Sequence, residues 1–147
     1  MVSDKDPYVF EQIEVGTVPV HVKHCPRQPG CWFRIIFHVG ARDDRIGKEG
    51  LAHMFEHLPF NGCKEFPNSD LVIEIKDDIF YGDFGAYTGF DHTCFWGRIP
   101  DISEAAVATR FISDFINHPL LDEKEFRREA GVIEQEIYKD FGNEKEI

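Results

Sequence analysis

The chain has 147 residues, of which 42% are hydrophobic and 29% charged, values typical of one globular domain. Its formal net charge of −11 excludes nucleic acid as an expected partner and argues against anionic membranes, because both require a basic surface. An acidic surface instead attracts basic peptide segments, or simply keeps the protein in solution. No stretch approaches the roughly 20 apolar residues that span a bilayer.

The N-terminus and the cysteines bear on the cellular compartment. Residues 1–6 lack the basic-then-apolar pattern of a signal peptide, so we expect a cytoplasmic protein; a leader already removed is the alternative. The cysteines, at positions 25, 31, 63 and 94, include no Cys-x-x-Cys pair, which predicts free thiols. The pair His24 and Cys25 has no matching second pair, so we expect no second metal site there.

The first third of the chain predicts two strands and a helix. Residues 17–24 alternate in character and predict a strand, which Pro19 places at an edge or an early position. Residues 32–39 predict a second, well-buried strand, and residues 40–50 a polar loop. A helix is expected from residue 51 to about residue 58, where Pro59 follows, because its apolar residues have helical spacing: Leu51, Met54, Phe55 and Leu58.

Further helices and a hairpin are predicted downstream. A helix opens at Pro67-Asn68-Ser69 and runs to about Phe80, and residues 84–99 fit a hairpin that turns at 89–92. A helix over residues 103–117 is expected to face inward through four side chains: Val107, Phe111, Phe115 and Ile116.

The last helix is predicted from a cap at Asp122 to about residue 140. Its expected inward stripe is narrow and apolar: Phe126, Ala130, Ile133 and Ile137. Taken together, this order of elements predicts an α+β domain, a mainly antiparallel mixed sheet with helices packed on it.

The helix expected at residues 51–58 carries the motif His-x-x-Glu-His. Because His53 and His57 are four residues apart, one helical turn places both imidazoles on the same face, where they can bind one zinc ion. Glu56 then lies at the rim, where it can accept a proton from zinc-bound water. The alternative is a surface helix with two solvated histidines, but an amphipathic helix after a buried strand favours the metal site.

A catalytic zinc needs a third protein ligand. On the last helix Glu129 and Glu136 lie two turns apart along one border of the apolar stripe, and Glu134 lies on the opposite border. A carboxylate at such a border can reach a metal held by a neighbouring helix. The alternative is that these glutamates face water, as most do.

Three stretches resemble the pitrilysin/insulysin family of zinc peptidases, which includes the mitochondrial processing peptidases. Gly50 to His57, with Phe60-Asn61-Gly62, resembles the block Gly-Leu-Ala-His-x-x-Glu-His-x-x-Phe-x-Gly. Gly85 to Thr88, with the later Thr93, resembles the Asn-Ala-x-Thr substrate strand, and residues 126–137 resemble the Glu-bearing helix.

The resemblance implies a role for each matching residue. His53, His57 and Glu136 would be the zinc ligands, Glu56 the general base and Glu129 a supporting carboxylate. Glu134 stays the alternative third ligand, because its separation from His57 is the one usual in the family, whereas two glutamates seven residues apart before Ile favour Glu136. The substrate strand would contain Ala86 and Thr88.

The sequence departs from the family in two ways. Gly85 stands where the family has Asn, which bears on one contact to the substrate backbone. Family members also have a longer catalytic domain and a second homologous domain that closes over the peptide. We therefore expect residues 1–147 to form a single, truncated catalytic domain that needs a second homologous domain or subunit, or a homo-oligomer.

The predicted function is that of a zinc-dependent metalloendopeptidase, which hydrolyses peptide bonds through a zinc-activated water. One alternative is a non-catalytic or partner-dependent subunit of a peptidase assembly. A remote alternative resembles S-ribosylhomocysteine lyase, in which a cysteine completes the metal site. Cys94 is the candidate for that ligand, although the Gly-Cys-Arg-Thr-Gly context of the lyase family is missing.

Overall fold

A computed structural model describes residues 9–141, so the prediction for residues 1–6 and both ends of the expected domain lie outside the described part of the chain. Within residues 9–141, none of the helices combines the length and the apolar character needed to cross a bilayer.

The fold is α+β with antiparallel sheets, which confirms the predicted class. The strands are β1 (Glu11–Val15), β2 (Val18–Val22), β3 (Cys31–Phe37), β4 (Phe84–Thr88) and β5 (Thr93–Ile99). The α-helices are α1 (Leu51–His57), α2 (Ser69–Phe80), α3 (Ala105–Asn117) and α4 (Glu123–Phe141). Short 3-10 turns cover Ala41–Asp43, Leu58–Asn61 and Ile102–Glu104.

The larger sheet has the order β3-β5-β4. Strands β4 and β5 form the predicted hairpin, in which the Gly89 N–H donates to the His92 carbonyl over 2.8 Å. The loop after β3 joins this turn, because the Ala41 N–H donates to the Gly89 carbonyl over 3.0 Å. Gly40 permits this close approach because it has no Cβ. A Cβ at this position would lie only 2.5 Å from the backbone nitrogen of His92. The loop that leads to α1 is thereby tied to the sheet.

Side chains of the expected types cap two helices. The side-chain oxygen Oδ1 of Asn68 accepts a hydrogen bond from the Leu71 N–H over 3.0 Å, and Asn68 is thereby the N-cap of α2. The Asp122 carboxylate accepts from the backbone N–H groups of Lys124 and Glu125, over 2.9 and 3.1 Å, at the start of α4. Both predicted helix starts are confirmed.

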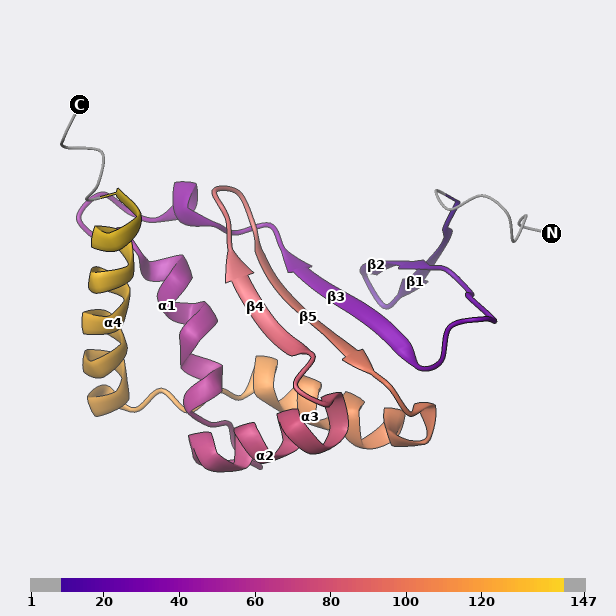
Figure 1. The fold of residues 1–147 in the computed structure, drawn as a ribbon. Helices are drawn as coiled ribbons and strands as arrows, with labels where there is room; N and C mark the ends of the chain where they lie inside the picture. The colour runs from indigo at the N-terminus through magenta and orange to yellow at the C-terminus, as the bar shows by residue number, and fades with distance from the viewer. Residues whose placement is uncertain (1–8, 142–147) are drawn as a thin grey trace.

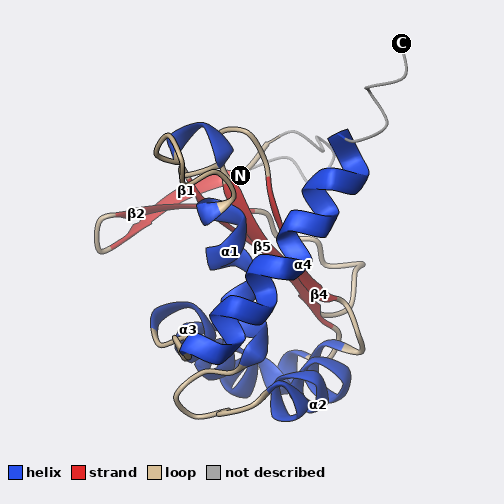
Figure 2. Cartoon of the chain, turned by 90° about the vertical axis from the view of Figure 1, so that its left-hand side faces the viewer, coloured by secondary structure: helices blue, strands red, loops and turns tan. Residues whose placement is uncertain are grey.

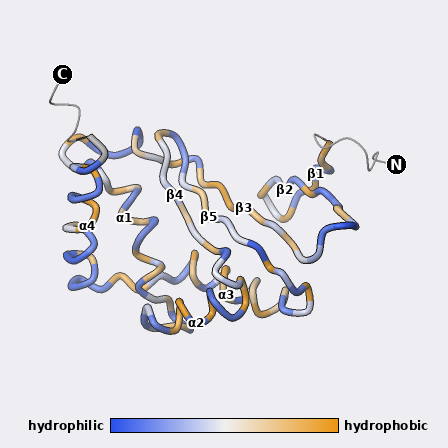
Figure 3. Tube along the Cα trace, viewed as in Figure 1, coloured by the Kyte–Doolittle hydropathy of each residue, from blue (hydrophilic) through white to orange (hydrophobic). Residues whose placement is uncertain are grey.

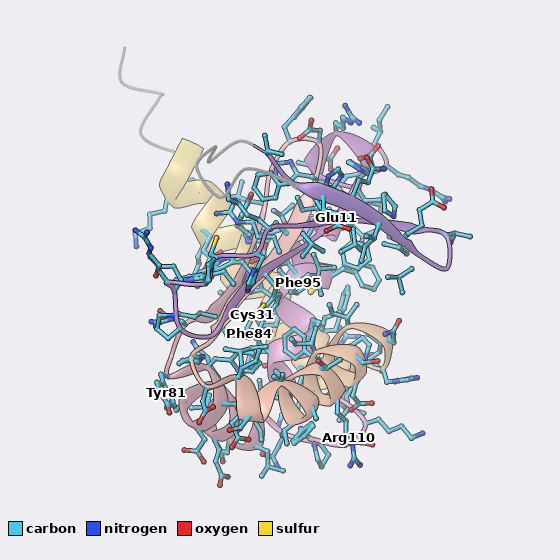
Figure 4. The ribbon with its side chains drawn as sticks, turned by 90° about the vertical axis from the view of Figure 1, so that its right-hand side faces the viewer. Glu11, Cys31, Tyr81, Phe84, Phe95 and Arg110 are labelled. Carbon is cyan, nitrogen blue, oxygen red and sulfur yellow. The ribbon has the colours of Figure 1, made fainter. Side chains whose placement is uncertain are left out.

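A cluster of phenylalanines forms the main core, where α2 and α3 pack on the sheet. Phe80, Phe84, Phe111 and Phe115 are almost completely buried. Their rings contact one another with centroid separations from 4.9 Å, between Phe80 and Phe84, to 5.8 Å, between Phe80 and Phe111. Figure 4 shows Phe84 and Phe95 in the interior and Tyr81 and Arg110 at the periphery. Each fully buried side chain of this size contributes about 1.5–3 kcal/mol.

The prediction that β3 is well buried was wrong. Trp32 is 62% exposed and Ile36 52% exposed. Successive side chains alternate between the faces of a strand. Phe33 therefore packs against the phenylalanine core and Ile35, on the same face, is half-buried, while Trp32 and Ile36 lie on the opposite face. Figure 3 shows hydrophobic stretches along β3 as well as in the helices.

Three smaller predictions also need correction. The sequence reading missed β1, which pairs with β2 in a hairpin at the far end of the molecule from α4 (Figure 1). The strand expected at residues 17–24 is shorter, Val18–Val22. Val107 is 44% exposed, because the buried face of α3 runs through Ala108, Phe111 and Phe115 instead.

The stripe predicted for α4 was also largely wrong. Ile133 is 4% exposed, but Phe126 and Ile137 are 40% and 38% exposed, and Ala130 is exposed. The buried side of α4 contains Glu129 beside Ile133, because α4 packs on α1 over a small cluster of Met54, Leu58 and Ile133. Figure 2 shows α4 crossing α1, with the sheet behind them. This contact joins the two helices that carry the candidate site.

Candidate metal centre

The position of α1 is set by a carboxylate at its start. Asp44 accepts three hydrogen bonds, from the backbone N–H groups of Gly50, Leu51 and Ala52, over 2.7, 3.1 and 2.9 Å. These N–H groups have no partner inside the helix, and a negative charge is favourable at the helix N-terminus. Gly50 has a φ of 88°, a left-handed conformation that glycine adopts without strain. His53 follows within the first turn.

Two histidines of α1 and one glutamate of α4 converge. The Nε2 atoms of His53 and His57 lie 3.1 Å apart. An Oε2 atom of Glu136 lies 3.5 Å from the His53 Nε2 and 3.7 Å from the His57 Nε2. Zinc binds nitrogen and oxygen at about 2.0–2.2 Å, so ligand atoms at the corners of its tetrahedron are about 3.3–3.6 Å apart. Both the spacing and the donor types therefore fit zinc.

Glu129 orients one of these histidines. Its Oε2 lies 2.9 Å from the His57 Nδ1. An ionised carboxylate can only accept, so His57 carries its proton on Nδ1, and its Nε2 lone pair faces His53 and Glu136. Burial raises the pKa of Glu129, but hydrogen bonds from His57 and Asn61 outweigh it and lower the pKa below its usual value. Glu129 therefore stays ionised beside His57.

A second pair of contacts holds Glu129 itself. Its Oε1 accepts from the Asn61 amide over 3.3 Å and from the Arg128 guanidinium over 2.9 Å. The guanidinium of Arg128 also donates to the Asn61 side-chain oxygen. Asn61 follows α1 and Arg128 belongs to α4, so these contacts fasten one helix to the other beside the donor group.

Glu56 lies next to the donor group but outside it. It is 8% exposed, and its Oε2 is 3.9 Å from the His53 Nε2. The Thr88 hydroxyl donates to this same oxygen over 2.7 Å. A carboxylate in this position can take a proton from a molecule that enters the site.

The site opens into a cavity of about 430 Å³ between α1, α4 and β4. Its lining residues are His53, Glu56, Ala86, Tyr87, Thr88, Glu136 and Lys139. A smaller hollow of about 260 Å³ adjoins it. Both predicted substrate-strand residues, Ala86 and Thr88, thus line the same cavity as the histidines.

Other candidates lie elsewhere. Glu134 is exposed on α4 and, within residues 9–141, the group that could hold a metal contains Glu136 instead. Cys94 is fully buried in β5 and does not belong to that group, which contradicts the lyase-like ligand set. The four cysteines are free, as predicted.

Sequence reasoning missed the residues around the donors. Asp44, Asn61 and Arg128 received no role. Asp44 lies six residues before Gly50, the N-cap of α1, so it does not occupy the position at which a capping residue is recognised from sequence. Asn61 and Arg128 gave no local signal either, because their contacts to Glu129 join segments far apart in the chain.

Gly85, where the resembling family has Asn, has a local explanation. A Cβ at this position would lie 2.9 Å from the Trp96 Cζ2 atom. The indole of the neighbouring strand therefore fills the space that a larger side chain would need.

Comparison with known proteins identifies the relatives of this chain. It is 36% identical over 104 residues to an uncharacterized zinc protease of Rickettsia bellii, covering 70% of this chain and 24% of that protein. It is 28% identical over 137 residues to Protease 3 of Escherichia coli, covering 92% of this chain and 14% of that protein. The crystal structure of the first half of the periplasmic protease PqqL from Escherichia coli superposes with a TM-score of 0.75 at 23% identity, covering 88% of this chain and 29% of that one.

The chain thus spans about a quarter or less of the length of these curated relatives. Residues 20–145 match the family described as Insulinase (Peptidase family M16), and this stretch contains every donor of the candidate metal centre. The chain belongs to the insulinase family of peptidases, family M16.

Proposed function

We propose that this chain carries the zinc site of a metalloendopeptidase, with His53, His57 and Glu136 as ligands. The observation that carries the proposal is the group of three donor atoms, all within 4.8 Å of one another, from two helices that pack together. Two relatives among the curated proteins are named zinc proteases, which supports zinc as the metal.

The chemistry follows from the donor set and its neighbours. A zinc ion held by these residues would lower the pKa of a water molecule to about 7 and polarise the carbonyl group of the substrate. Glu56 takes up the proton of the attacking water and passes it to the leaving amine. Glu129 keeps the Nε2 lone pair of His57 directed at the metal.

The substrate is a peptide in extended form. Strand β4 is an edge of the described sheet, and its residues Ala86 and Thr88 line the cavity beside Glu56. A peptide that adds to this edge would form backbone hydrogen bonds with β4 and place a scissile bond near the metal. Such binding depends more on the extended backbone of the peptide than on the identity of its side chains.

A second domain or subunit completes the enzyme in this proposal. The site is open to solvent, since the Glu136 side chain is 46% exposed, and catalysis benefits from exclusion of water. The relatives are at least several times longer than the stretch they share with this chain. We therefore expect the isolated chain to bind zinc and to cleave peptides slowly. A partner-dependent subunit without activity of its own remains the second candidate, favoured by the exposed apolar side chains of β3.

Zinc binding and peptide cleavage by the purified chain test this function. We expect one zinc per chain and hydrolysis of a mixed peptide pool that a chelator stops. Glu56→Gln should retain zinc and lose hydrolysis, whereas Glu136→Gln should lose zinc. Glu134→Gln is the matched control, with the same charge change on the same helix, and should behave like the wild type. Zinc loss in Glu134→Gln but not in Glu136→Gln would refute the ligand assignment.

A further inference from the structure

We propose that Thr88 is a positioning residue that holds the Glu56 carboxylate at the rim of the metal centre and keeps it out of the metal's coordination. This inference rests on the proposed function, in which Glu56 is the general base. It starts from the 2.7 Å hydrogen bond between the Thr88 hydroxyl and the Glu56 Oε2.

The direction of this hydrogen bond is fixed by its neighbours. The Thr93 hydroxyl donates its only proton to the Val39 carbonyl over 2.9 Å. Thr88 lies 3.4 Å from Thr93, a much weaker contact than its 2.7 Å contact with Glu56. A carboxylate only accepts, and 2.7 Å is within the usual range of about 2.5–2.7 Å for a hydroxyl donating to a charged oxygen. Thr88 therefore gives its single proton to Glu56.

The position of Glu56 explains why such a restraint matters. Its Oε2 lies 3.9 Å from the His53 Nε2, while the three proposed ligand atoms are separated by 3.1 to 3.7 Å. A small side-chain rotation would bring this oxygen to a distance typical of a fourth ligand. A catalytic zinc site has to keep its fourth position for water. The Thr88 hydroxyl opposes that rotation.

The position of Thr88 is fixed by the sheet. It is the last residue of β4 and pairs across the sheet with Thr93, the first residue of β5. Thr93 is 7% exposed, and its bond to Val39 connects it to the loop that follows β3. Strands β4 and β5 and this loop thus fix the position of Thr88 relative to α1, which carries Glu56.

The test compares two substitutions of Thr88. Thr88→Val removes the hydroxyl and keeps the shape, whereas Thr88→Ser keeps the hydroxyl. Thr109→Val is the matched control, because Thr109 lies exposed on α3 with its hydroxyl bonded to the Ala105 carbonyl. The wild type and these three variants are each loaded with cobalt(II) for visible absorption spectra and with zinc for peptide kinetics.

We expect Thr88→Val to bind one cobalt ion with an altered spectrum, because the carboxylate has entered the coordination sphere. Its kcat should fall at least about 10-fold, part of the 100-fold or more that a general base supplies, with KM within about 2-fold. Thr88→Ser and Thr109→Val should match the wild type within about 3-fold. An unchanged spectrum and kcat in Thr88→Val, or a change in KM alone, would overturn the inference.

A third readout separates this inference from the proposed function. Thermal unfolding of the metal-free chain is measured for Thr88→Val, Glu56→Ala and the double variant; Ala is used because the amide of Gln could still accept the Thr88 proton. If Thr88 holds Glu56, the two shifts in Tm are not additive. If the Tm shifts of the two single variants add up in the double variant, the inference about Thr88 is wrong, whether or not the chain binds metal or cleaves peptides. If the Tm shifts are not additive but the chain shows no turnover, only the proposed function is contradicted.

Discussion

Replacing Glu129 with Gln probes how the site controls His57. The carboxylate has two oxygens, one facing the His57 Nδ1–H at 2.9 Å and the other accepting from Arg128 and Asn61 at 2.9 and 3.3 Å. The amide of Gln has one acceptor and one donor group. Either His57 or the pair Arg128 and Asn61 then faces an N–H₂, so one side of the arrangement must break.

We expect the loss to appear as weaker zinc binding. Partners of this kind contribute 10- to 100-fold in metal affinity, or about 1.4–2.8 kcal/mol. Because Glu129 is buried and its partners cannot all be satisfied by an amide, the effect should fall in the upper half of that range. Zinc affinity is measured by competition with a chromophoric chelator at neutral pH.

Glu134→Gln provides the reference, because it makes the same charge change on the exposed side of α4. If the zinc affinity of Glu129→Gln lies within about 2-fold of this reference, His57 does not depend on Glu129 for its orientation, and the reasoning from the 2.9 Å contact is wrong.

Three further predictions concern the scaffold. Asp44→Ala removes the cap of α1 and should lower the free energy of unfolding by about 0.5–2 kcal/mol in urea titrations, whereas Asp44→Asn should lose less; equal losses would contradict a capping role. Burial raises the pKa of Asp114, but hydrogen bonds from the Glu65 N–H, Cys63 and His118 lower it below 3.8. Its contribution to stability is therefore complete above that pH and is lost as the pH falls through the lowered pKa, a loss that Asp114→Asn should lack in acid titrations followed by circular dichroism. Burial and Asp114 raise the pKa of Cys63 to about 12, so a maleimide should label the exposed Cys25 and Cys31 in the native chain but Cys63 and Cys94 only after unfolding; native labelling of Cys63 would contradict its placement.

The sequence predicted those elements that rest on local signals. The spacing of His53 and His57, the cap at Asn68 and the turn at residues 89–92 each depend on neighbours within a few positions, and the structure has a helix or a hairpin at each. The resemblance then selected Glu136 over Glu134, and the structure brings Glu136 to the histidines.

Features that depend on tertiary contacts could not be predicted in this way. A stripe of apolar residues was expected to face inward on α4, but Glu129 is buried there because His57, Asn61 and Arg128 satisfy its charge. The bond from Thr88 to Glu56 joins residues on a strand and a helix, which no local pattern can indicate. The exposure of Trp32 depends on which face of β3 is covered, a property of the assembled layers.

A crystal structure of the zinc-loaded chain would show whether His53, His57 and Glu136 bind one zinc ion together. Diffraction data collected at the zinc absorption edge identify the ion without reference to the protein atoms. We expect a single strong anomalous peak about 2 Å from both Nε2 atoms and from a Glu136 carboxylate oxygen, with Glu134 in solvent and Glu56 outside the coordination sphere. A peak bound by Glu134, or no peak between the two histidines at saturating zinc, would contradict this assignment.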